Sequence, residues 1–291
     1  MIFKGSAVAL ITPFDKHGKV NFFSLKNLIE YQIANGTKAI VILGTTGESS
    51  CITFEEREKI IKFCVSLIAK RVPVIVGTGA NSTSKAIMLT KQAENLGADA
   101  VLIVTPYYNK CNQTGLFKHY KLIAKSTSLP IILYNVPART GVNINTETTL
   151  KLSKIKNIVA IKEASGNLNQ IAEICRKKPS NFAVYSGDDQ LTLSMLTLGA
   201  SGVISVTANA YPEKVTLMCD YALGYDYFNA CKLQSDLFEI NKALFFDINP
   251  ICVKFYLNLL GFDVGEPRLP LCTPSQEIKT KLKEIKQKYE N

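Results

Sequence analysis

The 291-residue sequence predicts an α/β protein: a (β/α)8 or TIM barrel with a C-terminal helical extension. Eight short apolar runs recur, mostly Val and Ile, as expected for parallel strands that are covered on both faces. Segments with helical spacing separate them, and the chain from residue 224 onward has no clear strand. The runs are Ala7–Ile11, Ala39–Leu43, Val72–Val76, Ala100–Val104, Ile131–Tyr134, Ile158–Ile161, Phe182–Tyr185 and Val203–Val206.

Start and stop signals support the predicted helices between these runs. Apolar residues between positions 25 and 33 share one helix face, and Gly36 is a natural stop. Thr53–Glu56 has the pattern of a capping box. Ser82 or Thr83 would begin a helix that runs to Leu96. Strands and helices therefore alternate throughout the first three quarters of the chain.

An open, doubly wound sheet is the alternative architecture. It would call for a dinucleotide fingerprint, GxGxxG, after a strand. Gly77-Thr78-Gly79 follows the third run, but Ser82 stands where the third glycine should be. Eight alternations favour the closed barrel instead. We therefore predict a catalytic barrel over residues 1–223 and a helical extension over 224–291 in the same folding unit.

Composition and charge argue against several classes of protein. The net charge is +10, but lysines and acids are interleaved and no nucleic-acid-binding signature is present. The densest basic stretch, Lys279–Lys288, has the pattern of an amphipathic surface helix. No apolar run approaches the roughly 20 residues that span a bilayer, and the first residues do not resemble a signal peptide. We expect no nucleic-acid or membrane partner and a cytoplasmic location.

The cysteines and histidines do not predict a metal site or a disulfide framework. The eight cysteines show no CxxC and no paired spacing, so reduced thiols are expected. The two histidines, His17 and His119, have no clustered partners that would complete a zinc site. We therefore expect no metal and no cofactor.

Lys162 is the main candidate for chemistry, because barrel active sites form at the carboxyl ends of the strands. It follows the run Ile158–Ile161 and, with a period of two, shares a face with Ala160 and Ile158, so it would point into the barrel. Burial there lowers the pKa of the amine, and the neutral amine can attack a carbonyl. A lysine that reaches solvent from the strand end, or one paired with Glu163, is the alternative.

Polar side chains follow the neighbouring strands. Tyr134 ends the fifth run and could relay protons, although a core aromatic residue would look the same. Thr45 and Thr46 lie in a glycine-flanked turn, which could bind a carboxylate or serve only as a turn. Arg139 lies in a loop bounded by proline and glycine, and its guanidinium suits a carboxylate. Their common position at strand ends is stronger evidence than any one of them.

Six motifs in this order resemble those of the 4-hydroxy-tetrahydrodipicolinate synthase family, also called the dihydrodipicolinate synthase family. That family is part of the class I aldolase and N-acetylneuraminate lyase superfamily. The resemblance extends over nearly the whole chain, from Gly5 to Leu271. The motifs are GTTGE, TPYYN, YNVPxRTG, IKEASG, SGDD and GVISV.

The resemblance implies a lyase that condenses pyruvate with L-aspartate 4-semialdehyde in lysine and diaminopimelate biosynthesis. It implies that Lys162 forms the imine, that Tyr134 and Thr45 transfer protons, and that Tyr108 completes the relay from a neighbouring subunit. It also implies substrate-binding roles for four residues: Thr46 for the pyruvyl carboxylate, Arg139 for the semialdehyde carboxylate, and Gly187 and Ile204 as lining. The expected assembly is a homotetramer, a dimer of tight dimers.

The resemblance further implies a regulatory lysine site at the tight-dimer interface. Its residues here would be Ser49, Ser50, Asn81, Lys85 and Tyr107. Lys85 departs from the acid that inhibited members tend to have, as Phe54 and Arg57 depart from histidines. A cationic Lys85 would repel an ammonium ligand. We therefore expect weak or absent inhibition by L-lysine.

Two other functions remain open from the sequence. N-acetylneuraminate lyase and 2-keto-3-deoxy sugar-acid aldolases share the lysine and the tyrosine. Arg139 favours the synthase, since the semialdehyde carries a second carboxylate. A catalytically inactive binding barrel would be expected to lack some of the matched positions, and all of them are present.

Overall fold

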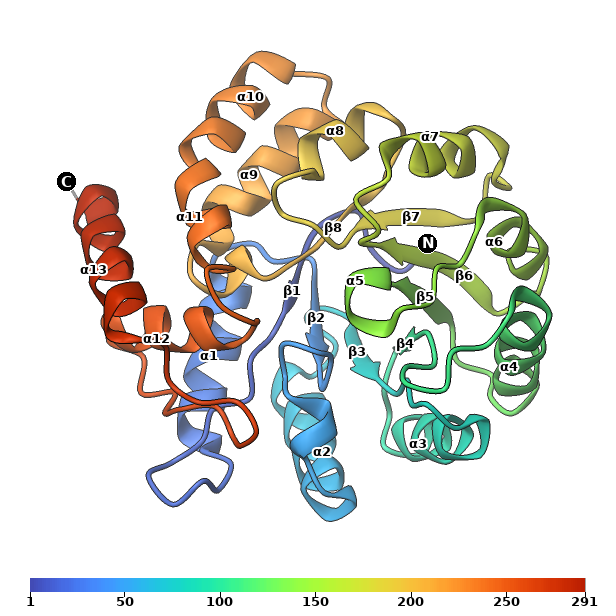
Figure 1. The fold of residues 1–291 in the computed structure, drawn as a ribbon, viewed down its shortest axis with the longest axis horizontal. Coiled ribbons are helices and arrows are strands. Elements are labelled where there is room, and N and C mark those ends of the chain that lie inside the picture. Colours follow the sequence, from blue (N-terminus) through green and yellow to red (C-terminus); the bar gives the residue numbers. More distant parts are fainter. Residues whose placement is uncertain (291) are drawn as a thin grey trace.

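The computed structural model describes residues 1–290 and shows eight parallel strands that close into a barrel in the order β1 to β8. Helices surround the barrel on the outside (Figure 1). All eight predicted runs are strands, with ends shifted by no more than a few residues. The strands are β1 Gly5–Ala9, β2 Ala39–Ile42, β3 Val74–Gly77, β4 Ala100–Val104, β5 Ile131–Asn135, β6 Ile158–Glu163, β7 Ala183–Ser186 and β8 Gly202–Ser205.

Helices follow the strands in the order expected of a (β/α)8 barrel. Two 3₁₀ turns, η1 Ser49–Cys51 and η2 Thr207–Asn209, interrupt the loops after β2 and β8. The helices are α1 Phe22–Ala34, α2 Phe54–Ile68, α3 Thr83–Asn95, α4 Gln113–Lys125, α5 Pro137–Thr140, α6 Thr146–Leu152, α7 Leu168–Lys177, α8 Thr192–Thr197, α9 Pro212–Leu223, α10 Tyr227–Asp236, α11 Phe238–Ala243, α12 Ile251–Leu259 and α13 Gln276–Glu290.

The helix boundaries follow the chemistry of their first and last residues. Gly36, just after α1, has a φ of +81°, which a residue without a Cβ adopts without strain. Thr53 and Glu56 form both halves of the capping box that begins α2. Ser82 is the N-cap residue of α3, but its hydroxyl lies 2.9 Å from that of Ser84 and does not cap the helix.

Apolar side chains form two cores that the strands separate. One fills the inside of the barrel and includes Ala7, Ile132, Ala160 and Ile204. The other lies between the strands and the surrounding helices. Side chains alternate between the two cores with a period of two along the strands. The exception is the start of β6, where the register shifts: Ile158 lies in the outer core and Ala160 in the inner one, so the expectation that both share a face with Lys162 is wrong for Ile158. In the register of the sheet, Lys162 on β6 lies beside Tyr134 on β5, at the end of the strands where the chemistry was expected.

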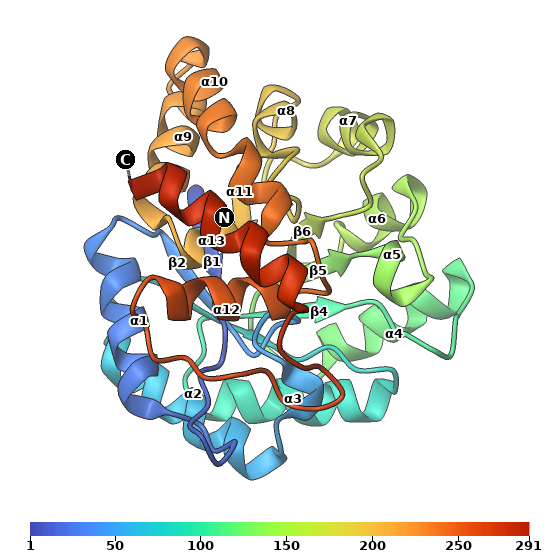
Figure 2. The ribbon, with the colours of Figure 1, turned by 60° about the vertical axis from the view of Figure 1, so that its left-hand side comes forward.

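The C-terminal extension, residues 224 onward, lies against one side of the barrel and contains α10 to α13. Figure 2 brings α12 and α13 to the front. The Nζ of Lys254 in α12 donates to Glu48 Oε1 at 2.9 Å, and both side chains are almost completely buried. The Arg268 guanidinium binds the carboxylate of Glu56 in α2. These contacts fit the proposal that barrel and extension form one folding unit.

Within the described residues, no helix is both long and apolar enough to cross a membrane. The predicted amphipathic helix over Lys279–Lys288 is part of α13, in which Leu282 is fully buried. All eight cysteines are free.

Candidate active site

A cavity of about 280 Å³ opens at the carboxyl ends of the strands, and we call it the Lys162 cavity. The loops after β2, β5, β6, β7 and β8 contribute to it, and so does the C-terminal extension. Its size fits a small-molecule substrate. The lining residues are Thr46, Tyr134, Val136, Ala138, Arg139, Lys162, Ala164, Gly187, Asp188, Gln190, Val206, Phe245 and Asn249.

The Lys162 side chain is 5% exposed and its ammonium lies 4.6 Å from the centre of the Tyr134 ring. Burial lowers its pKa to about 8, a shift that the charge of Asp189 partly offsets and that of Arg139 reinforces. At that pKa about one tenth of the amine is neutral at pH 7, against less than about 0.1% for an ordinary lysine. The cavity therefore holds a nucleophilic amine.

Glu163, the next residue, does not neutralise Lys162. Its carboxylate accepts hydrogen bonds from Asn135 Nδ2 at 2.9 Å and from the backbone N–H of Ser165 at 2.9 Å. Gln170 Nε2 donates to it at 3.1 Å. Successive residues of a strand point to opposite faces, so Lys162 enters the barrel and Glu163 faces the helices. This geometry rules out the paired lysine that the sequence had left open.

Tyr134 and Thr45 form a polar pair beside the amine. Tyr134 is 7% exposed, and burial raises its pKa. The charge of Arg139 and a hydrogen bond with the Thr45 side chain act in the opposite direction. The phenol is therefore protonated at neutral pH and can donate to, and take back a proton from, a group bound to Lys162.

Thr46 and Arg139 come together through Asn249, a residue of the C-terminal extension. The Nδ2 of Asn249 donates to Thr46 Oγ1 at 2.9 Å, and the Arg139 guanidinium donates to the Asn249 backbone oxygen at 3.1 Å. Thr46 is buried, whereas Arg139 is exposed at the rim. A hydroxyl deep in the cavity and a guanidinium at its mouth can hold two carboxylates at different depths.

Gly187 leaves room for the lysine side chain. A Cβ at this position would lie 2.8 Å from both Lys162 Cε and the Cβ of Ala164. Nearby, the buried carboxylate of Asp189 accepts from the Ser205 hydroxyl and from the backbone N–H of Val206 at 2.9 Å. A glycine at 187 is therefore required for the packing of the Lys162 side chain. Burial raises the pKa of Asp189, and the hydrogen bonds from Ser205, Val206 and Thr207 act in the opposite direction.

Three predicted site residues, Thr45, Ile204 and Tyr108, lie outside the lining of the Lys162 cavity. Ile204 is buried in the core inside the barrel, while Val206 of the same segment lines the cavity. Tyr108 is 87% exposed and has a φ of +69°. The side chain of Tyr108 thus points to solvent in the single chain.

A second cavity, of about 270 Å³, contains four of the five predicted regulatory residues, and we call it the Arg57 cavity. Ser49, Ser50, Lys85 and Tyr107 line it, and Asn81 does not. Arg57 also lines it, is 3% exposed, and donates to the backbone oxygen of Gly77 at 2.8 Å. No carboxylate is among the described residues that line this cavity.

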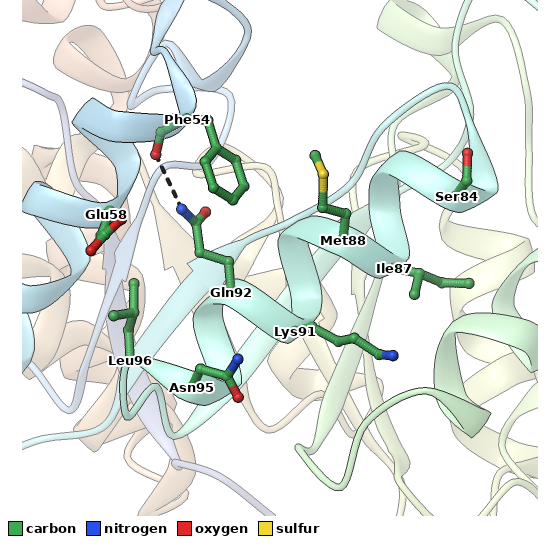
Figure 3. A pocket seen from close by; sticks show the side chains of 9 residues that line it. All are labelled: Phe54, Glu58, Ser84, Ile87, Met88, Lys91, Gln92, Asn95 and Leu96. Carbon is green, nitrogen blue, oxygen red and sulfur yellow. Dashed lines mark hydrogen bonds between the residues drawn. The ribbon is translucent and has the colours of Figure 1, made fainter.

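A wider groove of about 560 Å³ lies between α2 and α3, on the outside of the barrel (Figure 3). Phe54 and Met88 supply apolar surface, and the amide of Gln92 is already bound to the Phe54 backbone oxygen at 3.1 Å. The charged residues Glu58 and Lys91 lie along it. Volume alone therefore does not identify the site, since this groove holds no buried nucleophile.

No group of three or more potential metal ligands occurs among residues 1–290. Three lining residues lie outside the six motifs quoted from the sequence: Phe245 and Asn249 of the extension, and Gln190. Phe245 and Asn249 lie in a segment without strand or helix periodicity, so only the fold places them at the cavity. For Asp189, the only feature of the sequence that indicates a position near the site is the SGDD motif, of which it is the last residue.

Comparisons with known proteins agree with this geometry. Residues 2–289 match the model of the dihydrodipicolinate synthetase family. The 4-hydroxy-tetrahydrodipicolinate synthase of Clostridium novyi (strain NT) is 48% identical, over 99% of this chain and 97% of that protein. The crystal structure of dihydrodipicolinate synthase from Aquifex aeolicus has a TM-score of 0.97 and 48% identity, and the match covers 99% of this chain and 98% of that one.

A further solved structure is that of the chloride-inhibited dihydrodipicolinate synthase from Acinetobacter baumannii, complexed with pyruvate. Its TM-score is 0.96 at 44% identity, with 99% of this chain and 98% of that chain covered. Family model, sequence identity and fold agree over nearly the whole chain. The chain therefore belongs to the dihydrodipicolinate synthetase family.

Proposed function

We propose that the chain is a lyase that condenses pyruvate with L-aspartate 4-semialdehyde to give 4-hydroxy-tetrahydrodipicolinate, in lysine and diaminopimelate biosynthesis. The observation that carries the proposal is Lys162: a buried amine, without an ion-pair partner among the described residues, in a cavity that also holds Tyr134 and Arg139. The names of the curated relatives support the same reaction.

The first half of the reaction forms the imine. The neutral Lys162 amine attacks C2 of pyruvate, and the resulting carbinolamine loses water to give the imine. Tyr134 lies against the amine and can protonate the departing hydroxyl, and Thr45 can pass the proton onward. We assign to the Thr46 hydroxyl a hydrogen bond to the pyruvyl carboxylate, which its position in the cavity lining supports.

The second half builds the ring. Tyr134, which has given its proton to the departing hydroxyl, takes the C3 proton and leaves an enamine. The enamine carbon attacks the aldehyde of the second substrate and forms a C–C bond, while the aldehyde oxygen takes up that proton and becomes a hydroxyl. The amine of that substrate then attacks C2 and displaces Lys162, so the enzyme amine is regenerated. We assign the second substrate's carboxylate to Arg139, whose guanidinium lines the cavity at its rim.

A direct test offers pyruvate with either aspartate semialdehyde or N-acetylmannosamine in a coupled assay. We expect turnover with the semialdehyde, because Arg139 complements its carboxylate. Turnover with N-acetylmannosamine alone would favour the sugar-acid lyases. If neither aldehyde is consumed and borohydride with pyruvate leaves the protein unmodified, the inactive binding barrel would be the better description.

We further propose a homotetramer built from tight dimers, in the cytoplasm. The exposed ring of Tyr108 supports the first part, since it is available to the cavity of a neighbouring subunit. Eight free thiols fit a reducing compartment. Tyr108→Phe should then slow turnover. Mixing this variant with a Lys162→Ala variant should form hybrid dimers, which test whether Tyr108 of one subunit acts in the cavity of the other.

Regulation by L-lysine is proposed to be weak or absent. The Arg57 cavity has two cationic residues, Arg57 and Lys85, and none of its described lining residues is an acid that could bind the ligand's ammonium. Steady-state assays with increasing L-lysine should show little change in rate. A micromolar inhibition constant would contradict this.

A further inference from the structure

Asn249 contacts both side chains to which the proposed function gives a substrate carboxylate. It lies between α11 and α12 and is 5% exposed. Its Nδ2 is 2.9 Å from Thr46 Oγ1, and its backbone oxygen accepts from the Arg139 guanidinium at 3.1 Å. A residue nearly 250 positions from the start of the barrel thus connects the deep and the outer part of the Lys162 cavity.

The Asn249 amide determines the direction of the Thr46 hydrogen bond. A hydroxyl has one proton to donate and two lone pairs, and an ionised carboxylate can only accept. Because Thr46 Oγ1 accepts from Asn249, its proton is left to point into the cavity. No other hydrogen bond of this hydroxyl occurs within residues 1–290. The arrangement leaves Thr46 as a donor toward an anionic oxygen.

The Asn249 side chain is not placed for stability alone. Its Oδ1 is buried and has no hydrogen-bond partner in the described part of the chain, an arrangement that costs free energy. Five residues further on, Lys254 binds Glu48, which closes the turn that carries Thr46. The buried ion pair between Lys254 and Glu48 therefore holds the segment that contains Asn249 against the turn that contains Thr46. The Asn249 amide stays within hydrogen-bond distance of Thr46, although its Oδ1 has no partner among the described residues.

We infer that Asn249 is a positioning residue that fixes the Thr46 hydroxyl as a hydrogen-bond donor to the carboxylate of the 2-oxo acid, and thereby sets the affinity for pyruvate. The inference rests on the proposed function, since it takes pyruvate as the substrate that Lys162 binds. It assigns part of the substrate specificity to the C-terminal extension.

The test measures borohydride trapping of pyruvate at increasing pyruvate concentration, so that only the first half-reaction is observed. Asn249→Ala and Thr46→Val should each raise the half-saturating concentration roughly tenfold, the cost of one hydrogen bond to a charged group. The double variant should rise no further than the larger single effect. Additive effects, roughly a hundredfold, would overturn the inference, because Asn249 would then act without Thr46.

Asn249→Asp is a variant of nearly the same size with the opposite hydrogen-bonding direction. A carboxylate at position 249 would accept the hydrogen bond of the Thr46 hydroxyl, which would then no longer donate into the cavity. Its negative charge would also repel the pyruvyl carboxylate. The half-saturating concentration should therefore exceed that of Asn249→Ala. A value equal to that of the unmodified protein would overturn the inference, and this variant keeps the test valid should the alanine variant fail to fold.

Asn241→Ala is the matched control. Asn241 is also a buried asparagine of the extension, 2% exposed, and its Nδ2 donates to the backbone oxygen of Asp189 at 3.3 Å. Its half-saturating pyruvate concentration should stay unchanged, and an increase like that of Asn249→Ala would mean general loosening. If the unmodified protein traps no pyruvate at all, the proposed function fails; if it traps pyruvate and Asn249→Ala saturates identically, only this inference fails.

Discussion

Lys162 and Lys254 are both buried lysines, and they differ in what surrounds the ammonium. Burial lowers the pKa of each to about 8. Lys254 Nζ donates to Glu48 at 2.9 Å and to the backbone oxygens of Thr12 and Glu266 at 3.0 Å each. Lys162 has no hydrogen bond or ion pair in the described chain and lines a cavity. The partners, and not the burial, separate a structural lysine from a nucleophilic one.

The partners also explain why one amine can react. The three acceptors around Lys254 use all three protons of its ammonium, and its side chain is fully buried, so a carbonyl compound cannot reach the nitrogen. Around Lys162, Tyr134 offers a ring face and a hydroxyl, and Asp189 acts only through its charge. We therefore expect substitutions of Lys162 to lower turnover and substitutions of Lys254 to lower the free energy of unfolding.

The largest expected effect is that of Lys162→Ala. Turnover should fall by more than about a thousandfold, because no other amine can form the imine. The midpoint of thermal unfolding should change little, since the lysine forms no buried ion pair. Turnover within tenfold of the unmodified enzyme would show that another residue carries the reaction.

Lys254→Met should lower the stability of the fold and leave imine formation on Lys162 intact, the opposite of what Lys162→Ala should do. It leaves the buried Glu48 carboxylate without its ion-pair partner and with the Arg268 backbone N–H as its remaining donor, which costs about 3–5 kcal/mol of unfolding free energy in chemical denaturation. Adding Glu48→Gln removes the unpaired charge and should restore part of that loss. The folded fraction should still trap pyruvate on Lys162. A separate, early unfolding of the extension would contradict the single folding unit.

Arg139→Ala should raise the half-saturating semialdehyde concentration by about ten- to a hundredfold, because it removes a charge-assisted hydrogen bond at the rim. Trapping of pyruvate should be nearly unaffected when it is measured well above the pKa of Lys162, where the charge of Arg139 no longer matters to the amine. If pyruvate trapping and use of the semialdehyde are impaired equally, Arg139 either binds pyruvate or has a structural role.

The smallest expected effect concerns pH. The trapping rate should rise with pH through a midpoint near the Lys162 pKa of about 8, because only the neutral amine attacks. Asp189→Asn removes the negative charge that raises this pKa, so the midpoint should move to lower pH. A midpoint that moves upward would mean that Asp189 does not act through its charge.

Much of the barrel is predictable from the sequence because its signals are local. Each strand is a short Val/Ile run, and Thr53 with Glu56 marks a helix start within four residues. The position of Lys162 also follows from a local rule, the period of two along β6. Tyr134, Thr46 and Arg139 were expected at one site because they follow strand ends, and Gly187 because of the resemblance; all four line the Lys162 cavity.

The rest of the site depends on contacts between distant segments. Asn249 meets Thr46 across about 200 residues, and no periodic pattern in the extension indicates that meeting. Glu163 likewise accepts from Asn135 of the neighbouring strand, 28 residues earlier in the chain, and no local pattern indicates that contact. Asn81 was grouped with Ser49 by resemblance, yet the Arg57 cavity excludes it.

The most direct measurement is borohydride trapping with pyruvate, followed by peptide mass spectrometry, since both buried lysines are present in one sample. We predict a covalent adduct on the peptide that contains Lys162 and none on the peptide that contains Lys254. An unmodified Lys162 peptide, or equal labelling of the two lysines, would contradict the claim that Lys162 is the imine-forming residue.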